Sequence, residues 1–257
     1  MIAIDLTDDV VLVMGGGGSI GSAIARTAGR AGARVAVADS QLDAAQAVAA
    51  HLNSQGYVAI AVQVDLTDSH SVQLCVDRVV GEWGRLTALV NAAGLWSSAP
   101  SEQMTDAMWH AMMDVNLTGV FRATRAAVPA LKAAGSGSIV SLSSVSAFAA
   151  SAESAPYSAT KAGVIGYTTG LSGELAPHGI RVNAICPGWV DGGFTHQALS
   201  TSADPAALRT AANGQHLLGR MATPDDIANA AVWLISDFAS FVTGTALLVD
   251  GGYMAKH

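Results

Sequence analysis

The sequence predicts a single α/β domain in which helices cover both faces of a seven-stranded parallel sheet. Short segments rich in apolar and β-branched residues alternate with longer Ala-rich segments along all 257 residues. Several of the short segments are apolar at every position, as in strands that are buried on both faces. No Pro- or Ser-rich linker divides the chain, so one doubly wound domain is expected over residues 1–257.

Each expected strand except the last is followed by a helical segment. The strands are predicted at Val10–Met14, Arg34–Ala38, Val58–Val64, Ala88–Val90, Ser138–Leu142, Arg181–Ile185 and Ala246–Val249. The helices are predicted near 20–31, 41–55, 69–83, 104–134, 155–176 and 224–236. This strict alternation is typical of a sheet built from parallel crossover units.

The segment 188–220 interrupts the alternation. Its Pro, Gly, Ser and Thr residues surround one short helical piece at 204–213. Because irregular stretches of this length inside a compact domain are usually functional, we expect a mobile flap over a binding site.

The composition excludes several classes of function. Only 13% of the residues are charged and the net charge is −7, which disfavours disorder, nucleic acid and anionic membranes as partners. No apolar run is long enough to span a membrane, and Met1–Asp5 lacks the basic region of a signal peptide. Cys75 and Cys186 are far apart, which suits a reducing cytoplasm. The low charge also suggests that another subunit covers part of the surface.

A glycine-rich loop follows the first strand and leads directly into a helix. Glycines let the backbone approach a pyrophosphate, and the helix start offers free N–H groups. Such loops also occur as plain turns, which is the alternative. The residues predicted to bind a dinucleotide here are Gly15, Gly18, Ser19, Ile20 and Gly21.

Asp39 ends the second strand, 18 residues beyond Gly21. A carboxylate at this place can accept hydrogen bonds from ribose hydroxyls and would repel a 2′-phosphate. The neighbouring Ser40 and Gln41 supply no cation, so the sequence favours NAD over NADP. The alternative role is an N-cap for the helix 41–55, and both roles could hold.

The next two strands also end in residues that suit a cofactor face. The carboxyl edge of an open parallel sheet is where ligands bind, although each residue taken singly is as compatible with a turn or cap. The expected contacts are Asp65, Leu66, Asn91, Ala92, Ala93 and Gly94.

Tyr157 and Lys161 stand four residues apart, on one face of a predicted helix. A phenol titrates near ~10, and a nearby ammonium favours the phenolate. Ser144 follows the fifth strand, and its hydroxyl can donate to a carbonyl oxygen. A Tyr–Lys pair alone is a weak signal, so its weight comes from its place after the nucleotide loop.

Taken together, these motifs resemble the short-chain dehydrogenase/reductase family over nearly the whole chain. The residues that carry the resemblance are Gly15 with Ile20-Gly21, Asn91-Ala92-Ala93-Gly94, Asn116, Ser144, Tyr157 with Lys161, Asn183, Pro187-Gly188 and Val249-Asp250-Gly251-Gly252. The resemblance implies a Rossmann-type fold, a bound nicotinamide dinucleotide and a tetramer.

It also implies roles for individual residues. Tyr157 would be the acid/base and Ser144 would hold the substrate oxygen. Lys161 would lower the pKa of Tyr157 and bind the nicotinamide ribose, while Asn116 would order a water in a proton relay. Pro187, Gly188 and Val190 are further expected cofactor contacts.

The chain departs from the family pattern at several positions. Ser19 replaces the middle glycine of the loop, where it could crowd the pyrophosphate, cap the helix or donate to phosphate. Gly192 replaces a Thr that often touches the cofactor, and Thr195 could compensate. Met14 and Ala92 are milder departures. These changes concern cofactor affinity and loop geometry rather than catalysis.

Aromatic residues beyond the strand ends are candidates for a substrate pocket, although core packing is an equal alternative. The expected substrate contacts are Trp96, Ser146, Phe148, Trp189 and Phe194. No two of the seven histidines are spaced as metal ligands on a helix, so no metal site is expected. Cys186 is expected to be a buried structural thiol.

The sequence therefore predicts an NAD(H)-dependent oxidoreductase that interconverts a secondary alcohol and a ketone. One alternative is a reductase of 3-oxoacyl thioesters, which would favour NADPH and a basic docking surface. The other is a non-catalytic dinucleotide-binding module, which would not need Tyr157.

Overall fold

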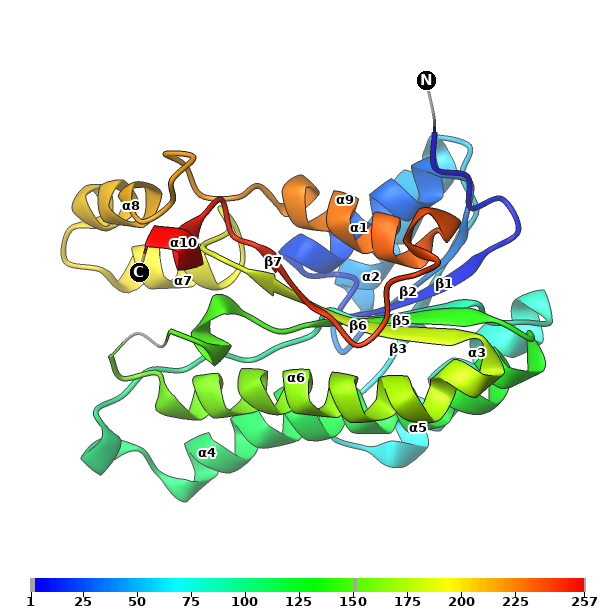
Figure 1. Cartoon of the computed structure of the whole chain (residues 1–257), viewed down its shortest axis with the longest axis horizontal. Helices are drawn as coiled ribbons and strands as arrows, with labels where there is room; N and C mark the ends of the chain where they lie inside the picture. Colours follow the sequence, from blue (N-terminus) through cyan, green and yellow to red (C-terminus); the bar gives the residue numbers. More distant parts are fainter. Residues whose placement is uncertain (1–2, 150–151, 257) are drawn as a thin grey trace.

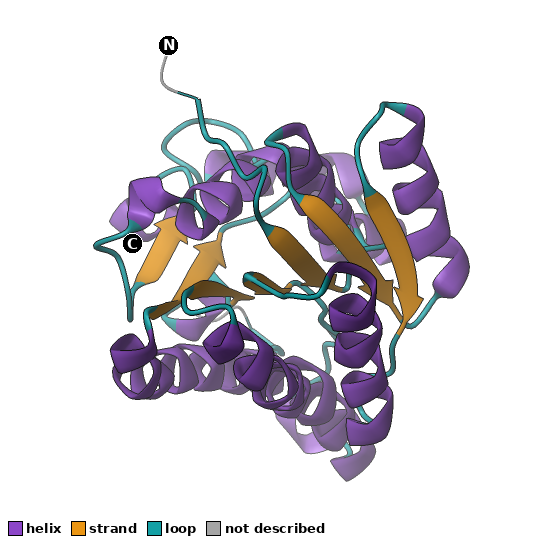
Figure 2. Ribbon diagram, turned by 90° about the vertical axis from the view of Figure 1, so that its right-hand side faces the viewer, coloured by secondary structure: helices purple, strands orange, loops and turns teal. Residues whose placement is uncertain are grey.

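The computed structural model describes residues 3–149 and 152–256, and the predicted architecture is confirmed. Over those residues seven parallel strands form one sheet in the order β3-β2-β1-β4-β5-β6-β7. The strands are β1 (Val10–Met14), β2 (Arg34–Asp39), β3 (Ala59–Gln63), β4 (Ala88–Asn91), β5 (Gly137–Leu142), β6 (Ile180–Pro187) and β7 (Ala246–Val249). Figures 1 and 2 show this sheet between two layers of helices.

The two layers explain why the strands are apolar throughout. In β1, Val11 and Val13 belong to the core beneath one helix layer, while Leu12 and Met14 belong to the core on the opposite face. One layer contains α1 (Ser19–Arg30), α2 (Leu42–Ser54) and α9 (Pro224–Ile235). The other contains α3 (Ser69–Trp83), α4 (Asp106–Met113), α5 (Gly119–Ala133) and α6 (Ala155–Leu175). Both faces of the sheet are therefore covered.

The direction of the strand order reverses between β1 and β4. Met14 at the end of β1 pairs with Ala38 on β2 and with Asn91 on β4. Since the connections from these strands leave in opposite directions, a crevice opens at their carboxyl ends, which is where ligands bind in such sheets.

The helical stretch expected near 104–134 is interrupted at Asn116. A π-helical turn, Asp114–Thr118, separates α4 from α5. The side chain of Asn116, in the middle of this turn, is hydrogen-bonded to the main chain of Leu95, which lies in the loop after β4. Such turns are frequent at functional sites.

The segment between β6 and α9 holds two helices, α7 (Phe194–Thr201) and α8 (Pro205–Gly214), of which only the second was predicted. The short α10 (Tyr253–Lys256) was also not predicted, and Figure 1 shows it beside α7 and α8. The carboxylate of Asp191 contacts Arg209 and His196, each at 3.0 Å, and so joins the start of this segment to both helices. Among the described helices, none has the length and hydropathy needed to cross a membrane.

Candidate active site

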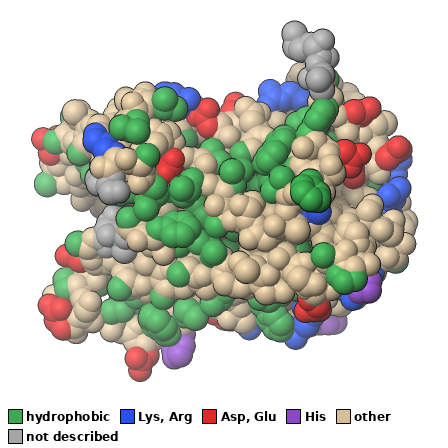
Figure 3. All heavy atoms as spheres, viewed as in Figure 1, with side chains coloured by type: hydrophobic (Ala, Val, Ile, Leu, Met, Phe, Trp, Pro, Cys, Tyr) green, Lys and Arg blue, Asp and Glu red, His purple; other side chains and the backbone are tan. Residues whose placement is uncertain are grey.

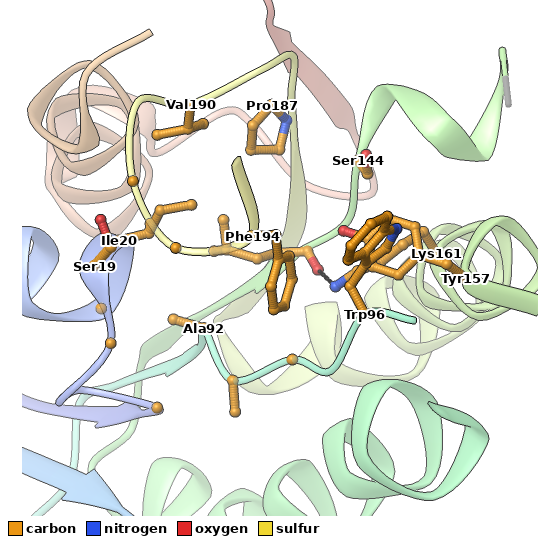
Figure 4. A pocket seen from close by; sticks show the side chains of 18 of the residues that line it. Ser19, Ile20, Ala92, Trp96, Ser144, Tyr157, Lys161, Pro187, Val190 and Phe194 are labelled. Carbon is orange, nitrogen blue, oxygen red and sulfur yellow. Dashed lines mark hydrogen bonds between the residues drawn. The ribbon is translucent and has the colours of Figure 1, made fainter. Parts of the chain in front are cut away.

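A cavity of about 570 Å³ lies at the carboxyl ends of the central strands and is bounded on one side by the segment 188–198. Figure 4 shows Ser19 and Ile20 on one side of it and Ser144, Trp96 and Tyr157 on the other, with Phe194 between them. The sequence-predicted residues that line it are Gly15, Gly18, Ser19, Ile20, Gly21, Asp39, Asp65, Leu66, Ala92, Ala93, Gly94, Trp96, Ser144, Ser146, Tyr157, Lys161, Pro187, Gly188, Trp189, Val190 and Phe194.

The glycine-rich loop has no room for side chains at two positions. A Cβ on Gly21 would lie 2.1 Å from the carbonyl oxygen of Gly15, and a Cβ on Gly15 would lie 2.5 Å from the Cα of Ala93. Gly15 also has a φ of +76°, which favours glycine. This close packing sets the first turn of α1 at the cavity, where its leading N–H groups have no acceptor within the helix.

Ser19 is the first residue of α1, and Gly18 is the N-cap without any side-chain hydrogen bond. The expectation that Ser19 caps the helix is therefore wrong. Its hydroxyl instead lies against the segment after β6, since a Cβ on Gly192 would come within 2.2 Å of Ser19 Oγ. Ser19 and Gly192, two departures from the family pattern, are thus in contact with each other.

Asp39 lines the cavity at the end of β2. Its Oδ2 accepts a hydrogen bond from the N–H of Gly17 and its Oδ1 accepts one from the N–H of Gln41, both at 3.0 Å. Gln41 is the N-cap of α2, so Asp39 does not cap the helix as the alternative held. The carboxylate is oriented by two main-chain donors beside the glycine-rich loop.

Asp65 lies two residues beyond β3, and its Oδ1 accepts from the N–H and the hydroxyl of Thr67. These hydrogen bonds hold the pKa of Asp65 below its usual range. Both carboxylates of the cavity thus lie on the side of β2 and β3.

Tyr157 and Lys161 lie in the first two turns of α6. Lys161 is buried, and its Nζ donates to the carbonyl oxygen of Leu142 at 2.8 Å, while lying 5.5 Å from the centre of the Tyr157 ring. Burial lowers the pKa of Lys161 to about 8. Burial also raises the pKa of Tyr157 to about 12, and a hydrogen bond with Ser144 offsets this only in part. Desolvation of the phenolate is thus the larger of these two effects, and the predicted lowering of the Tyr157 pKa by Lys161 stays a prediction.

Ser144 lies just after β5, and its hydroxyl is hydrogen-bonded with Tyr157 at the start of α6. Ser144 Oγ accepts from the N–H of Ser146 at 3.1 Å. The neighbouring Ser143 donates its hydroxyl to the main-chain oxygen of Lys161 at 2.8 Å, which ties β5 to α6. Ser143 is thus a positioning residue that the sequence did not indicate.

Asn116 is fully buried, and its side chain does not line the described cavity. Its Oδ1 accepts from the N–H of Leu95 at 2.7 Å, and its Nδ2 donates to the carbonyl of Leu95 and to Thr160 Oγ1. The amide therefore fixes the loop after β4 against α6, next to Tyr157. Its predicted part in a proton relay stays a prediction.

The chain matches known proteins over nearly its whole length. Residues 15–254 match the family model described as enoyl-(acyl carrier protein) reductase. The cis-4-hydroxycyclohexanecarboxylate dehydrogenase of Sinomonas cyclohexanicum is 38% identical over 96% of both chains. The cyclopentanol dehydrogenase of Comamonas testosteroni is 35% identical over 98% of this chain and 99% of its own. The crystal structure of a short-chain type dehydrogenase/reductase from Mycobacterium marinum superimposes with a TM-score of 0.91 at 31% identity, covering 97% of each chain.

This chain belongs to the short-chain dehydrogenase/reductase family. The fold, the glycine-rich loop and the group formed by Ser144, Tyr157 and Lys161 lie where the resemblance implied. In this dehydrogenase they come from three separate elements, namely α1, the end of β5 and α6.

Two predicted contacts lie elsewhere. Asn91 is buried in β4, where its Nδ2 donates to Ser141 Oγ, and it is absent from the described cavity lining. Its side chain links β4 to β5, because Asn91 stands opposite Ser141 in the paired strands. Phe148 is 52% exposed and also lies outside the lining, since the turn after β5 directs it to the surface. Their predicted contacts with cofactor and substrate stay predictions.

Several lining residues were missed by the sequence reasoning. They include Gln41, Val115, Ser143, Val145, Ala152, Ser154, Ala198 and Tyr253. Ala198 was missed with the helix α7, although its spacing of four from Phe194 would place both on one helix face. Tyr253 was missed because it follows the last strand and is distant in sequence.

A buried histidine, His216, packs behind the segment 188–198 that bounds the cavity. Its Nδ1 lies 2.8 Å from the carbonyl of Ala212, and its Nε2 accepts from the N–H of Trp189 at 3.2 Å. A Cβ on Gly188 would lie 2.6 Å from Nε2, so Gly188 leaves room for this contact. The ring of His216 also lies 5.7 Å from that of Tyr253.

Proposed function

We propose that the protein is an NAD(H)-dependent oxidoreductase that interconverts a secondary alcohol and a ketone, with Tyr157 as the acid/base. The observation that carries the proposal is the meeting of Ser144 and Tyr157, above the buried Lys161, at one end of a cavity whose other end is a glycine-rich loop. One relative is named for the dehydrogenation of cyclopentanol and another for that of a cyclic hydroxycarboxylate, and both names support the same reaction at a secondary alcohol.

The residues present fit a dinucleotide. The first N–H groups of α1 would hold the pyrophosphate. Gly15 and Gly21 allow the tight turn that brings these N–H groups to the cavity, because a side chain at either position would clash with the loop. Asp39 would accept from the adenosine ribose, and Lys161 with Tyr157 would hold the nicotinamide ribose. When bound, the cofactor supplies the hydride acceptor or donor. Pro187, Gly188 and Val190 would close the nicotinamide end.

The protein's own part is to place the substrate oxygen and to move one proton. Ser144 Oγ donates to the substrate oxygen and fixes its position. In ketone reduction the Tyr157 hydroxyl gives its proton to this oxygen, and in alcohol oxidation the phenolate takes it back. Lys161 stabilises the phenolate, and Asn116 holds the loop that closes the site beside Tyr157. The water relay at Asn116 belongs to this proposal.

The preference for NAD rests on Asp39. Its carboxylate is oriented by Gly17 and Gln41, and the described lining has no Lys or Arg side chain on the side of β2 and β3. A 2′-phosphate there would meet a negative charge without a compensating cation. We expect Asp39→Ala to weaken binding of NAD⁺ while weakening that of NADP⁺ less, measured by quenching of the Trp fluorescence.

The alternatives are less well supported. A 3-oxoacyl thioester reductase would need a basic surface for its carrier, and the net charge is −7. A non-catalytic binding module would have no use for the arrangement of Ser144, Tyr157 and Lys161. The decisive test is NADH formation across aliphatic, cyclic, aromatic and hydroxy-acid secondary alcohols, with Tyr157→Phe as the blank. Turnover by the Tyr157→Phe variant equal to that of the native enzyme refutes the proposed acid/base.

We further propose a cytoplasmic homotetramer in which residues 188–220 form a flap over the substrate. The face that carries β7 supports self-association, because Figure 3 shows hydrophobic side chains across its middle and charged ones mostly at its margins. The exposed apolar side chains near β7 include Phe238, Phe241 and Leu248. Light scattering at micromolar protein should give four times the mass of one chain, and a monomer mass refutes the tetramer.

A further inference from the structure

The wall around Tyr157 is built from four separate segments, and its side chains are uncharged. It includes Trp96 after β4, Val145 and Ser146 after β5, Trp189 and Phe194 from the segment after β6, and Tyr253 of α10. The ring of Phe194 meets that of Tyr157 edge-on, with centres 6.2 Å apart and an interplanar angle of 88°. Phe194 also lies over Gly94, whose Cβ position would be 3.4 Å from Phe194 Cζ. Aromatic surface thus flanks the Tyr157 hydroxyl.

The charged side chains of the cavity either lie away from this wall or already have a hydrogen-bond partner. Of the described lining residues, Asp39 and Asp65 follow β2 and β3, on the far side of the glycine-rich loop from Tyr157. Lys161 is the only cation among them, and it is 3% exposed with its Nζ on the Leu142 carbonyl. A second anion-binding group at the wall of Tyr157 is therefore absent from the described residues.

The nearby cations outside the lining are also engaged. Arg209 and His196 both contact the carboxylate of Asp191 at 3.0 Å. The charge that stands between the lining residues Ala152 and Ser154 is Glu153, which is negative. An anionic group of a substrate would thus leave water for a wall that holds a few hydroxyls but no free cation among the described residues, and burial of a charge without a counter-charge is unfavourable.

We propose that this site selects uncharged secondary alcohols and ketones with an apolar ring beside the carbinol carbon, and that it rejects the same molecules once they bear a carboxylate. This inference rests on the proposed function and adds its substrate class. The polar groups that remain near Tyr157 are hydroxyls of Ser144, Ser146 and Ser154, which suit neutral hydrogen-bonding substituents.

The test compares two substrates of nearly equal shape, methyl 4-(1-hydroxyethyl)benzoate and the free carboxylate 4-(1-hydroxyethyl)benzoate. We expect kcat/KM with NAD⁺ to favour the ester by roughly 100-fold or more, because the wall offers the carboxylate no counter-charge. Equal or better turnover of the carboxylate overturns the inference and leaves the proposed function intact.

A charge introduced into the wall should reverse part of this preference. Ala198 lines the cavity one turn after Phe194, whereas the neighbouring Gln197 is exposed and outside the lining. We expect Ala198→Arg to raise the carboxylate-to-ester ratio of kcat/KM by roughly tenfold or more, as for a new charge-assisted hydrogen bond. The matched control Gln197→Arg adds the same charge on the same helix and should leave the ratio unchanged. An equal rise in both variants contradicts a role for the cavity wall.

A binding measurement separates this inference from the proposed function. The Tyr157→Phe protein, saturated with NADH, is titrated with methyl 4-acetylbenzoate and with 4-acetylbenzoate in a calorimeter. Preferential binding of the ester supports the inference even where neither alcohol is oxidised by the native enzyme, which would refute the proposed function alone. Equal or tighter binding of the carboxylate overturns the inference.

Discussion

Replacing Gly192 by Thr tests the contact between the glycine-rich loop and the segment after β6. A Cβ at this position would lie 2.2 Å from Ser19 Oγ and 3.2 Å from Ser19 Cβ, with Pro224 Cγ at 3.6 Å on another side. Rotation of the Ser19 hydroxyl relieves only the first of these contacts. Overpacking of a closely packed place destabilises by about 1–3 kcal/mol, and we expect Gly192→Thr to lower the free energy of unfolding by that amount.

Removal of the Ser19 side chain should restore most of this loss. We expect the double variant Ser19→Gly/Gly192→Thr to be more stable than the sum of the single effects predicts, with a coupling of about 1–3 kcal/mol. Urea denaturation gives the four free energies of the cycle, and a fluorescence titration with NAD⁺ should show the same recovery of affinity. A coupling indistinguishable from zero refutes the argument that the two residues share one place.

Gly193 provides the matched control. Its Cβ position is 3.8 Å from Ser19 Cβ, an ordinary contact, but its φ of +51° favours glycine. Gly193→Ala should therefore destabilise through the backbone, by about 1 kcal/mol, and Ser19→Gly should not rescue it. Rescue of Gly193→Ala as well would show that Ser19→Gly stabilises the protein generally.

Three further results are expected. Tyr157→Phe should lower kcat by about 10²–10⁴-fold, since the phenol moves the proton, and should lower NAD⁺ affinity in a fluorescence titration far less, since Lys161 still holds the nicotinamide ribose. The kcat/KM of alcohol oxidation should rise with pH through the neutral and alkaline range, because burial raises the pKa of Tyr157 and its proton must leave first; a flat profile contradicts this. Asp226→Asn should destabilise by about 0.5–2 kcal/mol in urea at neutral pH, because Asp226 completes the capping box of α9 and pairs with Arg220. The pKa of Asp226 is lowered to about 2, so its stabilisation is present above the usual Asp range and should disappear as pH falls through about 2.

The sequence predicted the sheet well because each strand carries its own signal. Apolar runs that are buried on both faces and separated by helical segments leave little freedom in topology, and six connections of one handedness fix the order of the strands. The helix α7 escaped prediction because Phe194–Thr201 has no clear apolar period and is held by tertiary contacts, such as that of His196 with Asp191. Local sequence does not record such contacts.

The candidate site was predictable where a residue type has one use and less so where it has several. The glycines of the loop were predictable because the packing there admits no side chain at Gly15 and Gly21, so the sequence must carry glycine at these positions. The link of Asn91 to Ser141 was not predictable, because an amide serves equally as a ligand or as a link between strands, and only the register of β4 against β5 brings the two residues together. The link between Ser19 and Gly192 could not be predicted, since 173 residues separate them and each looks like an independent departure.

The raised pKa of Tyr157 connects the structure of the site to the pH dependence of each direction of the reaction. Burial penalises the phenolate and so favours the protonated phenol, and the hydrogen bond with Ser144 offsets this only in part. A protonated phenol is the form that ketone reduction requires, whereas alcohol oxidation first requires loss of that proton. The same burial excludes charged substrates from the wall beside Tyr157, so one property, an apolar environment, sets both the protonation of the acid/base and the class of molecule that reaches it.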